Sequence, residues 1–423
     1  MNFNRRRFLQ AFGASAAVAA VPSIAGAAEG TQGTHVVVVG GGFAGATAAK
    51  YLRMWSDKKI RVTLIDPKAS HTSCVLSNLV LNGNITLNEL TLSYDSLRSF
   101  YGVEVIRDHV TELHPDGAGV TLKNGGDLRC DRVVIATGIA FKKPQGDVNY
   151  KETPHAWIAG SQTKLLARQV RGLSAGDTFV MTIPKGPYRC PPGPYERACV
   201  VADMLQQKGG GKVFVLDEND GIQAEKATFS KAFGGLYSEI IEYVPNATVE
   251  SVDSANHEVR ADGRLYAGDV VNIIPRQRAL WFVRKAGLTK GGDGWAPVDP
   301  LTYASTVPGF ENVHVIGDSQ TSYQPKSAHM ANSQAKVCAD AIIRSLAGLP
   351  NDSLERKQNI TTNSACYSPI TSDEASWLTV NYAYDTAAGR MMKVHGGEAE
   401  EWSRESYQEM FAWASNLFTD SFH

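Results

Sequence analysis

Two strand–helix–strand units stand out in the pattern of hydrophobic and polar positions. In the first, residues 34–66, the apolar runs THVVVVG and IRVTLID enclose the helical stretch ATAAKYLRMW. In the second, residues 177–219, the runs TFVMTI and KVFVLDEN enclose the helical stretch ERACVVADMLQQKG. Continuous apolar runs separated by a helix are typical of parallel strands that are covered on both faces. The pattern therefore predicts an α/β fold with two Rossmann-like units.

The turn of the first unit carries a glycine motif. Gly40 allows the tight turn, Gly42 lets a pyrophosphate approach the backbone, and Gly45 lets the helix pack on the strand. Asp66 ends the second strand 21 residues after Gly45, where a carboxylate accepts hydrogen bonds from ribose hydroxyls. Strand, helix, second strand and acid together predict a dinucleotide site.

Two later segments indicate that this dinucleotide is FAD. Residues 129–140, RCDRVVIATGIA, read as a buried strand that ends at Thr137-Gly138. This strand is like the segment that passes close to FAD in two-domain flavin oxidoreductases. Residues 306–318 end in Gly317-Asp318. They resemble the flavoprotein strand whose terminal aspartate hydrogen-bonds the ribityl chain of the flavin. The order and spacing of the three segments favour FAD over NAD.

A helix is predicted to begin near Lys326 and Ser327. The stretch after Ser327 has helical periodicity, and its N-terminus would point at the flavin. A helix N-terminus there stabilises the negative charge of reduced flavin, so Lys326 is placed among the FAD-binding residues.

The turn of the second unit does not suit a pyridine nucleotide. Its sequence, PKGPYRCPPGPYE, replaces the expected glycine loop by prolines, which have no N–H to offer a pyrophosphate: Pro184, Pro187, Pro191, Pro192 and Pro194. Cys190 stands where a nicotinamide would approach. We infer that this unit has lost NAD(P)H as a partner and that electrons come from another donor, such as a sulfur compound.

Three of the six cysteines are candidates for chemistry. Cys74 follows Asp66 by eight residues, so it is either a nucleophile that reaches the flavin or a buried structural thiol. Arg189 and a helix N-terminus favour a thiolate at Cys190, and Glu196 is near enough to accept a proton; a structural disulfide is the alternative. Cys366 lies in TTNSACYSPI, which reads as a loop, and a long-range disulfide with Cys190 is one option. Cys199 and Cys338, on predicted helices, are expected in the core.

The N-terminus and the charge balance bear on location and partners. Residues 1–28 combine Arg5-Arg6-Arg7, a weakly apolar run and a small-residue cleavage site, as in a twin-arginine signal peptide, so a periplasmic protein is expected. The chain holds 42 basic and 43 acidic residues without a basic stripe, which argues against nucleic acid. No later stretch approaches the roughly 18 apolar residues of a membrane span, and no cysteine or histidine spacing suits a metal.

The segments TSCVLSN, YRCPPGPYERA, QPKSAHMANSQ and NSACYSP resemble one family over essentially the whole chain, the flavoprotein subunit of flavocytochrome c sulfide dehydrogenase. The resemblance implies FAD joined to Cys74 by an 8α-S-cysteinyl bond. It also implies a redox-active disulfide between Cys190 and Cys366 on the flavin face. Beside it, the resemblance places Glu196 as the acidic residue that helps to deprotonate the substrate. Sulfide would open the disulfide, and its electrons would pass through FAD to a separate c-type cytochrome subunit. A partner must supply the haem because this chain has no C-x-x-C-H.

The expected fold has two interleaved Rossmann-like domains of the disulfide-reductase type, the second degenerate, and a small C-terminal α+β domain. The expected boundaries are a signal peptide 1–28, an FAD domain 34–150 and 265–345, a degenerate NAD-type domain 151–264 with the cysteine loop, and a C-terminal domain 346–423 of a cytochrome-interface or dimerisation-like type. The aromatic residues of this last domain are expected to pack in its core, to cap the flavin or to face the cytochrome. A sulfide:quinone oxidoreductase and an FAD electron-transfer or assembly protein without its own substrate are the alternatives. An NAD(P)H-dependent disulfide reductase is a third, weakened by the missing glycine loop.

Overall fold

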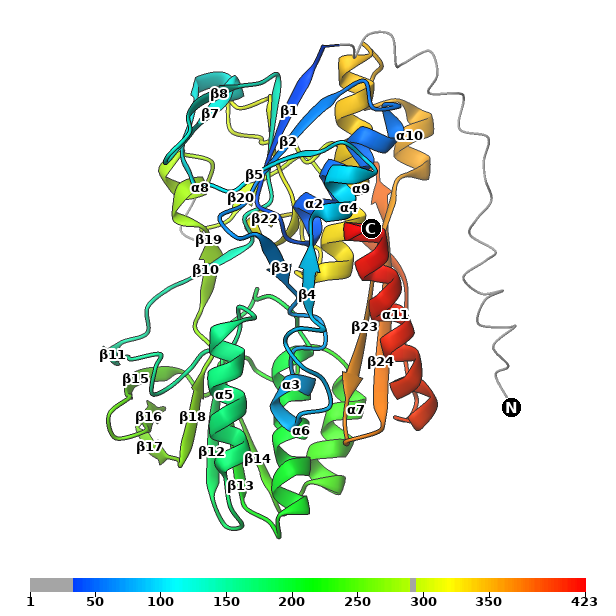
Figure 1. The fold of residues 1–423 in the computed structure, drawn as a ribbon. Coiled ribbons are helices and arrows are strands. Elements are labelled where there is room, and N and C mark those ends of the chain that lie inside the picture. The colour runs from blue at the N-terminus through cyan, green and yellow to red at the C-terminus, as the bar shows by residue number, and fades with distance from the viewer. Residues whose placement is uncertain (1–32, 290–293) are drawn as a thin grey trace.

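The structure is a computed structural model that describes residues 33–289 and 294–423. The expected signal peptide, residues 1–28, lies outside the described residues. Figure 1 shows two α/β domains stacked one above the other, with a long C-terminal sheet and helix running along one side of both.

The upper domain is built on a parallel sheet of five strands in the order β21-β9-β1-β2-β5. The strands are β1 (His35–Val39), β2 (Arg61–Ile65), β5 (Glu104–Ile106), β9 (Arg132–Ile135) and β21 (Val313–Val315). Val36, Val37 and Val38 are fully buried, as expected for a central strand covered on both faces. Helices α2 (Phe43–Trp55) and α9 (Ala328–Leu346) pack against each other beside this sheet (Figure 1).

The lower domain has a second parallel sheet, in the order β14-β13-β12-β18. Its strands are β12 (Thr178–Ile183), β13 (Lys212–Asp217), β14 (Ile241–Pro245) and β18 (Val270–Ile273), and helix α6 (Gly193–Gln207) connects β12 to β13. The second predicted unit therefore forms, with the helix starting three residues earlier than its hydrophobic pattern indicated. Strand β18 lies beyond the expected boundary at 264, because its backbone pairs with β12 of this domain.

A small antiparallel pair joins the two domains: β10 (Ile139–Phe141) leaves the upper domain and β19 (Gln277–Ala279) returns to it. The lower domain is thus inserted into the upper one, and the predicted class of two interleaved Rossmann-like domains is confirmed. Smaller sheets complete both domains, β6-β7-β8 in the upper and β11-β15-β16-β17 in the lower. Their bounds are Val110–Leu113, Gly119–Leu122 and Gly126–Arg129, then Gly146–Asp147, Val249–Asp253, Glu258–Ala261 and Arg264–Ala267.

The C-terminal region is an antiparallel sheet and a helix. Strands β23 (Thr361–Pro369), β24 (Ala375–Asp385) and β25 (Arg390–Glu398) pair in chain order, and helix α11 (Arg404–Phe422) covers one face (Figure 1). The expectation of a loop around Cys366 is wrong, because Cys366 lies in β23 and pairs with Leu378 of β24. The segment's polar composition hid a strand that forms through pairing with its neighbour.

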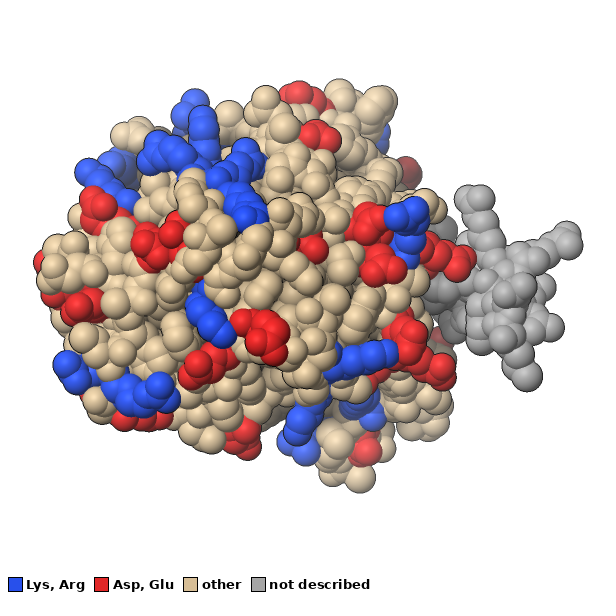
Figure 2. Space-filling view, turned by 90° about the horizontal axis from the view of Figure 1, so that it is seen from below, with Lys and Arg blue, Asp and Glu red and all other residues tan. Residues whose placement is uncertain are grey.

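The lower face of the molecule carries charges of both signs among uncharged residues (Figure 2). This mixed face shows no broad basic surface of the kind that binds nucleic acid. Among the described helices, none is both long and apolar enough to span a membrane. The described histidines, cysteines and carboxylates form no group that could hold a metal ion.

Candidate active site

A cavity of about 190 Å³ lies at the carboxyl ends of the upper domain's strands. We call it the dinucleotide cavity. It is lined by the turn between β1 and α2, by Asp66 after β2, by Thr137-Gly138 after β9 and by Gly317-Asp318 after β21. Parallel sheets of this kind bind ligands at this edge. The structure therefore brings together the three segments on which the FAD prediction rests.

The glycines of the first turn differ in their surroundings. A side chain at Gly40, whose φ is +103°, would meet the carbonyl oxygen of Ala136 at 2.6 Å. One at Gly45 would overlap the carbonyl oxygen of Gly40. At Gly42 the nearest atom is Cε1 of His71, 3.6 Å away. Gly40 and Gly45 thus shape the turn, whereas Gly42 opens onto the cavity, where a pyrophosphate can reach the N-terminus of α2.

The two aspartates in this cavity are held in place by the protein. Asp66 accepts hydrogen bonds from the backbone N–H of Gly41 (2.7 Å) and of Lys68 (2.8 Å). Asp318 accepts one from Nε of Arg189 at 2.6 Å through Oδ2, while its Oδ1 is buried and has no partner among the described residues. An unpaired buried carboxylate oxygen costs free energy unless a ligand donates to it. The site therefore fits a ligand with hydroxyl donors, such as the ribityl chain of FAD.

Helix α9 begins at the boundary of this cavity, where its start was predicted. The hydroxyl of Ser327 caps the helix by accepting from the N–H of Met330 at 3.1 Å, and Ser327, Ala328 and Ala331 line the cavity. Lys326 is not among the lining residues. Its ammonium donates to the carbonyl oxygens of Asp318 (2.9 Å) and Gln320 (2.6 Å). Lys326 thus holds the backbone of the Asp318 segment in place without lining the cavity itself.

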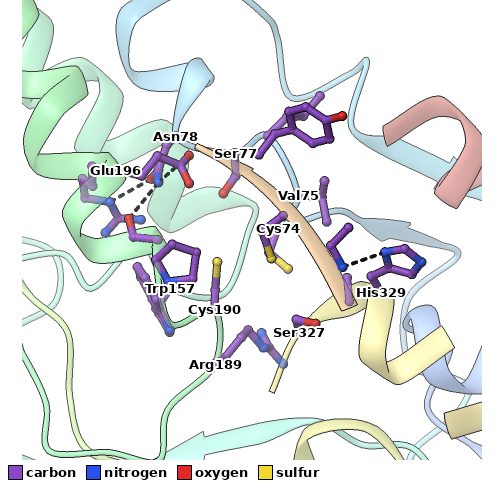
Figure 3. Close-up of a pocket in the computed structure, with 18 of the residues that line it drawn as sticks. Cys74, Val75, Ser77, Asn78, Trp157, Arg189, Cys190, Glu196, Ser327 and His329 are labelled. Carbon is purple, nitrogen blue, oxygen red and sulfur yellow. Dashed lines mark hydrogen bonds between the residues drawn. The ribbon is translucent and has the colours of Figure 1, made fainter. Parts of the chain in front are cut away.

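A smaller cavity of about 70 Å³ borders the dinucleotide cavity and is lined by three cysteines. We call it the cysteine cavity. Cys74 comes from the loop after β3 (Ser70–Thr72), Cys190 from the loop before α6, and Cys366 from β23. Figure 3 shows Cys74 and Cys190 facing the same space, with Glu196 and Asn78 on one side and Arg189 on another. Cys74 lines both cavities, as do Arg189, Ser327 and Ala328.

Cys190 is fixed by an unusual backbone. Its φ is +58°, a left-handed conformation that a residue with a side chain adopts at a cost. Its N–H donates to the carbonyl oxygen of Lys326 at 2.7 Å, and its carbonyl accepts from the N–H of Gly193 at 3.0 Å. A side chain at Gly193 would approach Sγ of Cys190 to 2.8 Å. The loop thus directs the Cys190 sulfur against the first turn of α6.

Glu196, on that first turn, belongs to a buried polar network. Its Oε1 accepts from Nδ2 of Asn78 (3.0 Å), and Oδ1 of Asn78 accepts from Nε of Arg197 (3.0 Å). Burial raises the pKa of Glu196 to about 8, although the contacts with Asn78 and Arg197 lower it. At neutral pH this residue is therefore a proton donor, whereas its expected role was that of an acceptor.

The cysteines of the cavity are thiols in the structure. Burial raises the pKa of Cys190 well above its usual range, and the neighbouring Cys366 and Glu196 raise it further. Burial likewise raises the pKa of Cys366, to about 12. The thiolate expected at Cys190 from Arg189 and the helix terminus is therefore not what this environment favours, because burial outweighs both. Cys190 and Cys366 are thus partly buried thiols that line the same cavity.

Sequence reasoning missed several residues that shape the site. Asn78 and Arg197 carry no motif of their own, because their contact joins residues 119 positions apart. His71 lines the dinucleotide cavity beside Gly42, and burial lowers its pKa to about 3, so it presents a neutral imidazole. By contrast, Cys199 and Cys338 are fully buried, which confirms the expectation that they pack in the core.

The fold and the two cavities define the class of protein, an FAD-dependent oxidoreductase with paired dinucleotide-binding folds. Residues 34–166 match the family model "Pyridine nucleotide-disulphide oxidoreductase". Residues 163–275 match the central part of the flavoprotein chain of flavocytochrome c sulfide dehydrogenase, and residues 358–422 match that family's flavin-binding region. The chain belongs to the family of flavoprotein chains of flavocytochrome c sulfide dehydrogenase, FAD-binding oxidoreductases that act on sulfide.

Relatives agree with this assignment. The sulfide dehydrogenase flavoprotein chain of Chlorobaculum thiosulfatiphilum is 58% identical over 46 residues, which cover 11% of this chain and 94% of that sequence. The mitochondrial sulfide:quinone oxidoreductase of Dictyostelium discoideum is 22% identical over 398 residues, covering 89% of this chain and 82% of that protein. The crystal structure of the sulfide:quinone oxidoreductase from Aquifex aeolicus superposes with a TM-score of 0.74 at 16% identity, covering 92% of both chains.

Proposed function

We propose that this chain is the sulfide-oxidising subunit of a periplasmic flavocytochrome c. In this role it takes two electrons from sulfide through a Cys190–Cys366 disulfide and FAD, and passes them to a c-type cytochrome. The observation that carries the proposal is the cysteine cavity, where Cys74, Cys190 and Cys366 from three distant segments line one space beside the dinucleotide cavity. The periplasmic location rests on the twin-arginine pattern of residues 1–28.

The proposed chemistry begins with attack of HS⁻ on one sulfur of the disulfide. The S–S bond breaks, one cysteine keeps the new sulfur as a persulfide, and the other leaves as a thiolate that carries the electron pair. Glu196, protonated near neutral pH, lines the cysteine cavity together with Cys190 and stabilises the leaving thiolate by donating to it. FAD, when bound, supplies an acceptor of two electrons that releases them singly.

Cys74 is proposed to hold FAD covalently through a thioether. It lines both the dinucleotide cavity and the cysteine cavity, so its sulfur lies at the border between cofactor and disulfide. The test is acid precipitation of the purified protein, which releases FAD that is not covalently bound. We expect the flavin to stay with the wild-type pellet and to leave the Cys74→Ser pellet. Flavin that stays with the Cys74→Ser protein would exclude this linkage.

The function is tested by anaerobic titration with sulfide while the flavin absorbance is followed. We expect bleaching in the wild type, recovery on adding cytochrome c, and loss of bleaching in Cys190→Ser and Cys366→Ser. Cys130→Ser is the matched control, because Cys130 lines none of the cavities described here. Bleaching that persists in both cavity variants would overturn the disulfide route and favour an FAD protein in which these cysteines are dispensable.

A second candidate is a sulfide:quinone oxidoreductase, favoured by the similarity to the proteins of that name from Dictyostelium and Aquifex. The two candidates share the donor and differ in the acceptor. After bleaching by sulfide, a water-soluble quinone and cytochrome c are added in separate experiments. Faster recovery with quinone would move this chain to the quinone branch, whereas faster recovery with cytochrome c supports the flavocytochrome proposal.

A further inference from the structure

A second cavity, larger than the cysteine cavity, also has Cys366 in its wall. It measures about 440 Å³, and we call it the outer cavity. It is lined by Gln223–Glu225 before α7 (Lys226–Lys231), by β24 and by Lys393 and Glu398 of β25. Of the cysteines in the described chain, Cys366 alone lines both the outer cavity and the cysteine cavity. Gln223, Lys393 and Glu398 are exposed, so the outer cavity reaches solvent.

Glu225 is the buried acid of the outer cavity. Its side chain is 3% exposed, and its backbone has φ +48° and ψ 45°, a left-handed conformation that is costly for a glutamate. Oε2 accepts a hydrogen bond from the hydroxyl of Ser368 at 2.6 Å. Oε1 is buried and has no hydrogen-bond partner among the described side chains and backbone. A left-handed backbone thus holds a buried carboxylate in the wall of the outer cavity.

The hydrogen bond from Ser368 joins the Glu225 carboxylate to β23, the strand that carries Cys366. Ser368 follows Cys366 by two residues in β23, so both side chains lie on the same face of the strand. The Glu225 charge is the leading electrostatic cause that raises the pKa of Cys366, after burial. Glu225 therefore stands beside the thiol that the outer cavity exposes.

The charged groups around Glu225 come from every neighbouring element. Glu398 of β25 lines the same cavity and raises the pKa of Glu225, and Lys393 is the cation of that strand that lines the cavity. The Glu225 charge raises the pKa of Glu196 and the pKa of Cys199, both on α6. It also raises the pKa of Cys366 on β23. Burial brings the pKa of Glu225 to about 7, while contacts with Ser368 and Ser376 act in the opposite direction.

We propose that hydrogen sulfide enters through the outer cavity and that Glu225 is a further catalytic residue, the base that takes its proton next to Cys366. The inference rests on the proposed sulfide oxidation. In the step, H₂S gives one proton to the Glu225 carboxylate. The resulting HS⁻ forms an S–S bond with Sγ of Cys366, and the Cys366–Cys190 bond breaks. Cys366 becomes the persulfide, and the electron pair stays on Cys190 as a thiolate.

The proposal gives the two buried acids, Glu225 and Glu196, different roles. Glu225 lines the outer cavity with Cys366, the sulfur that is attacked, whereas Glu196 lines the cysteine cavity and is assigned the donor role toward Cys190, the sulfur that leaves. Neutral H₂S crosses a buried passage at lower cost than HS⁻, because burial penalises an unpaired charge. Deprotonation at the end of the outer cavity therefore produces the nucleophile only where it reacts.

The test is Glu225→Gln, which keeps the shape and removes the base. The second-order rate of flavin bleaching by sulfide is measured by stopped flow across pH. At about pH 6.5, where most sulfide is H₂S, we expect the wild type to be at least about tenfold faster. At about pH 9 the sulfide is already anionic and the Glu225 charge repels it, so the variant should equal or exceed the wild type. A ratio of rates that does not change with pH would overturn the proposal.

Two further variants keep the test decisive. Ser368→Ala removes a hydrogen-bond donor to the carboxylate, which raises the pKa of Glu225. The pH at which the rate profile of Ser368→Ala crosses that of Glu225→Gln should therefore be higher than the pH at which the wild-type profile crosses it. Thr379→Phe, on β24, narrows the outer cavity and should slow bleaching at every pH; an unchanged rate would exclude this route.

Controls separate this inference from the proposed function. Glu400→Gln changes an exposed glutamate outside the three cavities and should match the wild type. Dithionite reduction should be unchanged in every variant. Failure of sulfide to bleach the wild type would sink the proposed function itself, whereas bleaching with equal profiles in wild type and Glu225→Gln would sink only the role of Glu225.

Discussion

Glu196 holds its proton at neutral pH, and the stability of the folded protein therefore depends on pH. Its folded pKa of about 8 lies above the ordinary value of 4.5, so folding favours its protonated form. The stabilisation from this proton is complete below about pH 4.5 and is lost as pH rises through 8. We expect Glu196→Gln, which cannot ionise, to remove this slope and to unfold at a higher temperature than wild type at about pH 8. Thermal unfolding across pH checks it.

The same substitution should slow the reaction. Glutamine can still accept from Asn78 but has no proton for the Cys190 thiolate, so bleaching by sulfide should fall by roughly 10²-fold near neutral pH. Glu400→Gln, an exposed change, serves as the control for both measurements. A variant that is stabilised yet reacts at the wild-type rate would show that Glu196 is only a buried acid without a role in proton transfer.

Individual residues differ in how far the sequence could place them. Asp318, Thr137 and the glycines follow from local motifs, because each lies at a strand end that the hydrophobic pattern marks. The pairing of Asn78 with Glu196 and Arg197 joins residues 118 and 119 positions apart, and no local pattern indicates it. Glu225 gave no signal in the sequence, because neither its left-handed backbone nor its hydrogen bond with Ser368, 143 positions away, follows from a local pattern.

In the turn between β1 and α2, one glycine is needed for cofactor binding and another for folding. At Gly42 the backbone φ is −76° and an added methyl group has space, so Gly42→Ala should fold normally but obstruct the pyrophosphate. At Gly45 the same methyl group overlaps the Gly40 carbonyl, so Gly45→Ala should disturb the turn and lower the unfolding temperature. FAD content and thermal unfolding of both variants check this contrast. Equal unfolding temperatures for the two variants would refute it.

Helix α11 closes the upper domain with its last turn. Phe422 is fully buried and packs on Phe43 at a centroid distance of 5.4 Å and on His71 at 5.5 Å, directly behind the dinucleotide turn. Phe422→Ala should cost about 3 to 5 kcal/mol and lower the FAD content as well. Denaturant unfolding and flavin absorbance measure the two effects. Phe411→Ala, at a partly exposed position on the same helix, should lose less of both.

The elements also show where the hydrophobic pattern is informative. Strands β1, β12 and β13 were predicted nearly to the residue, because central parallel strands are apolar on both faces. Strand β23 was missed because TTNSACYSPI has neither alternation nor an apolar run. Its pairing with β24 and the packing of α9 against it determine its conformation.

For the whole molecule, the three cavities adjoin one another through shared lining residues. The dinucleotide cavity meets the cysteine cavity at Cys74, and the cysteine cavity meets the outer cavity at Cys366. Ser327, the cap of α9, lines all three. Each domain supplies one part: the upper domain the cofactor site, the lower domain Cys190 and Glu196, and the C-terminal sheet Cys366. In the proposed reaction, sulfide would therefore meet Cys366 from the outer cavity while electrons leave through the dinucleotide cavity.

The lower domain keeps the nucleotide-binding topology but not its chemistry, which leads to the last prediction. Helix α6 begins at Gly193 with Pro194 in its first turn, and the loop before it holds Pro191, Pro192 and the strained Cys190, so few N–H groups are available to a pyrophosphate. We expect anaerobic NADH or NADPH to leave the flavin oxidised over minutes at concentrations where sulfide bleaches it within the mixing time. The measurement is the flavin absorbance after each donor, with dithionite as the positive control. Bleaching by NADH would show that this loop still admits a nicotinamide, and the protein would then join the disulfide reductases whose fold it shares.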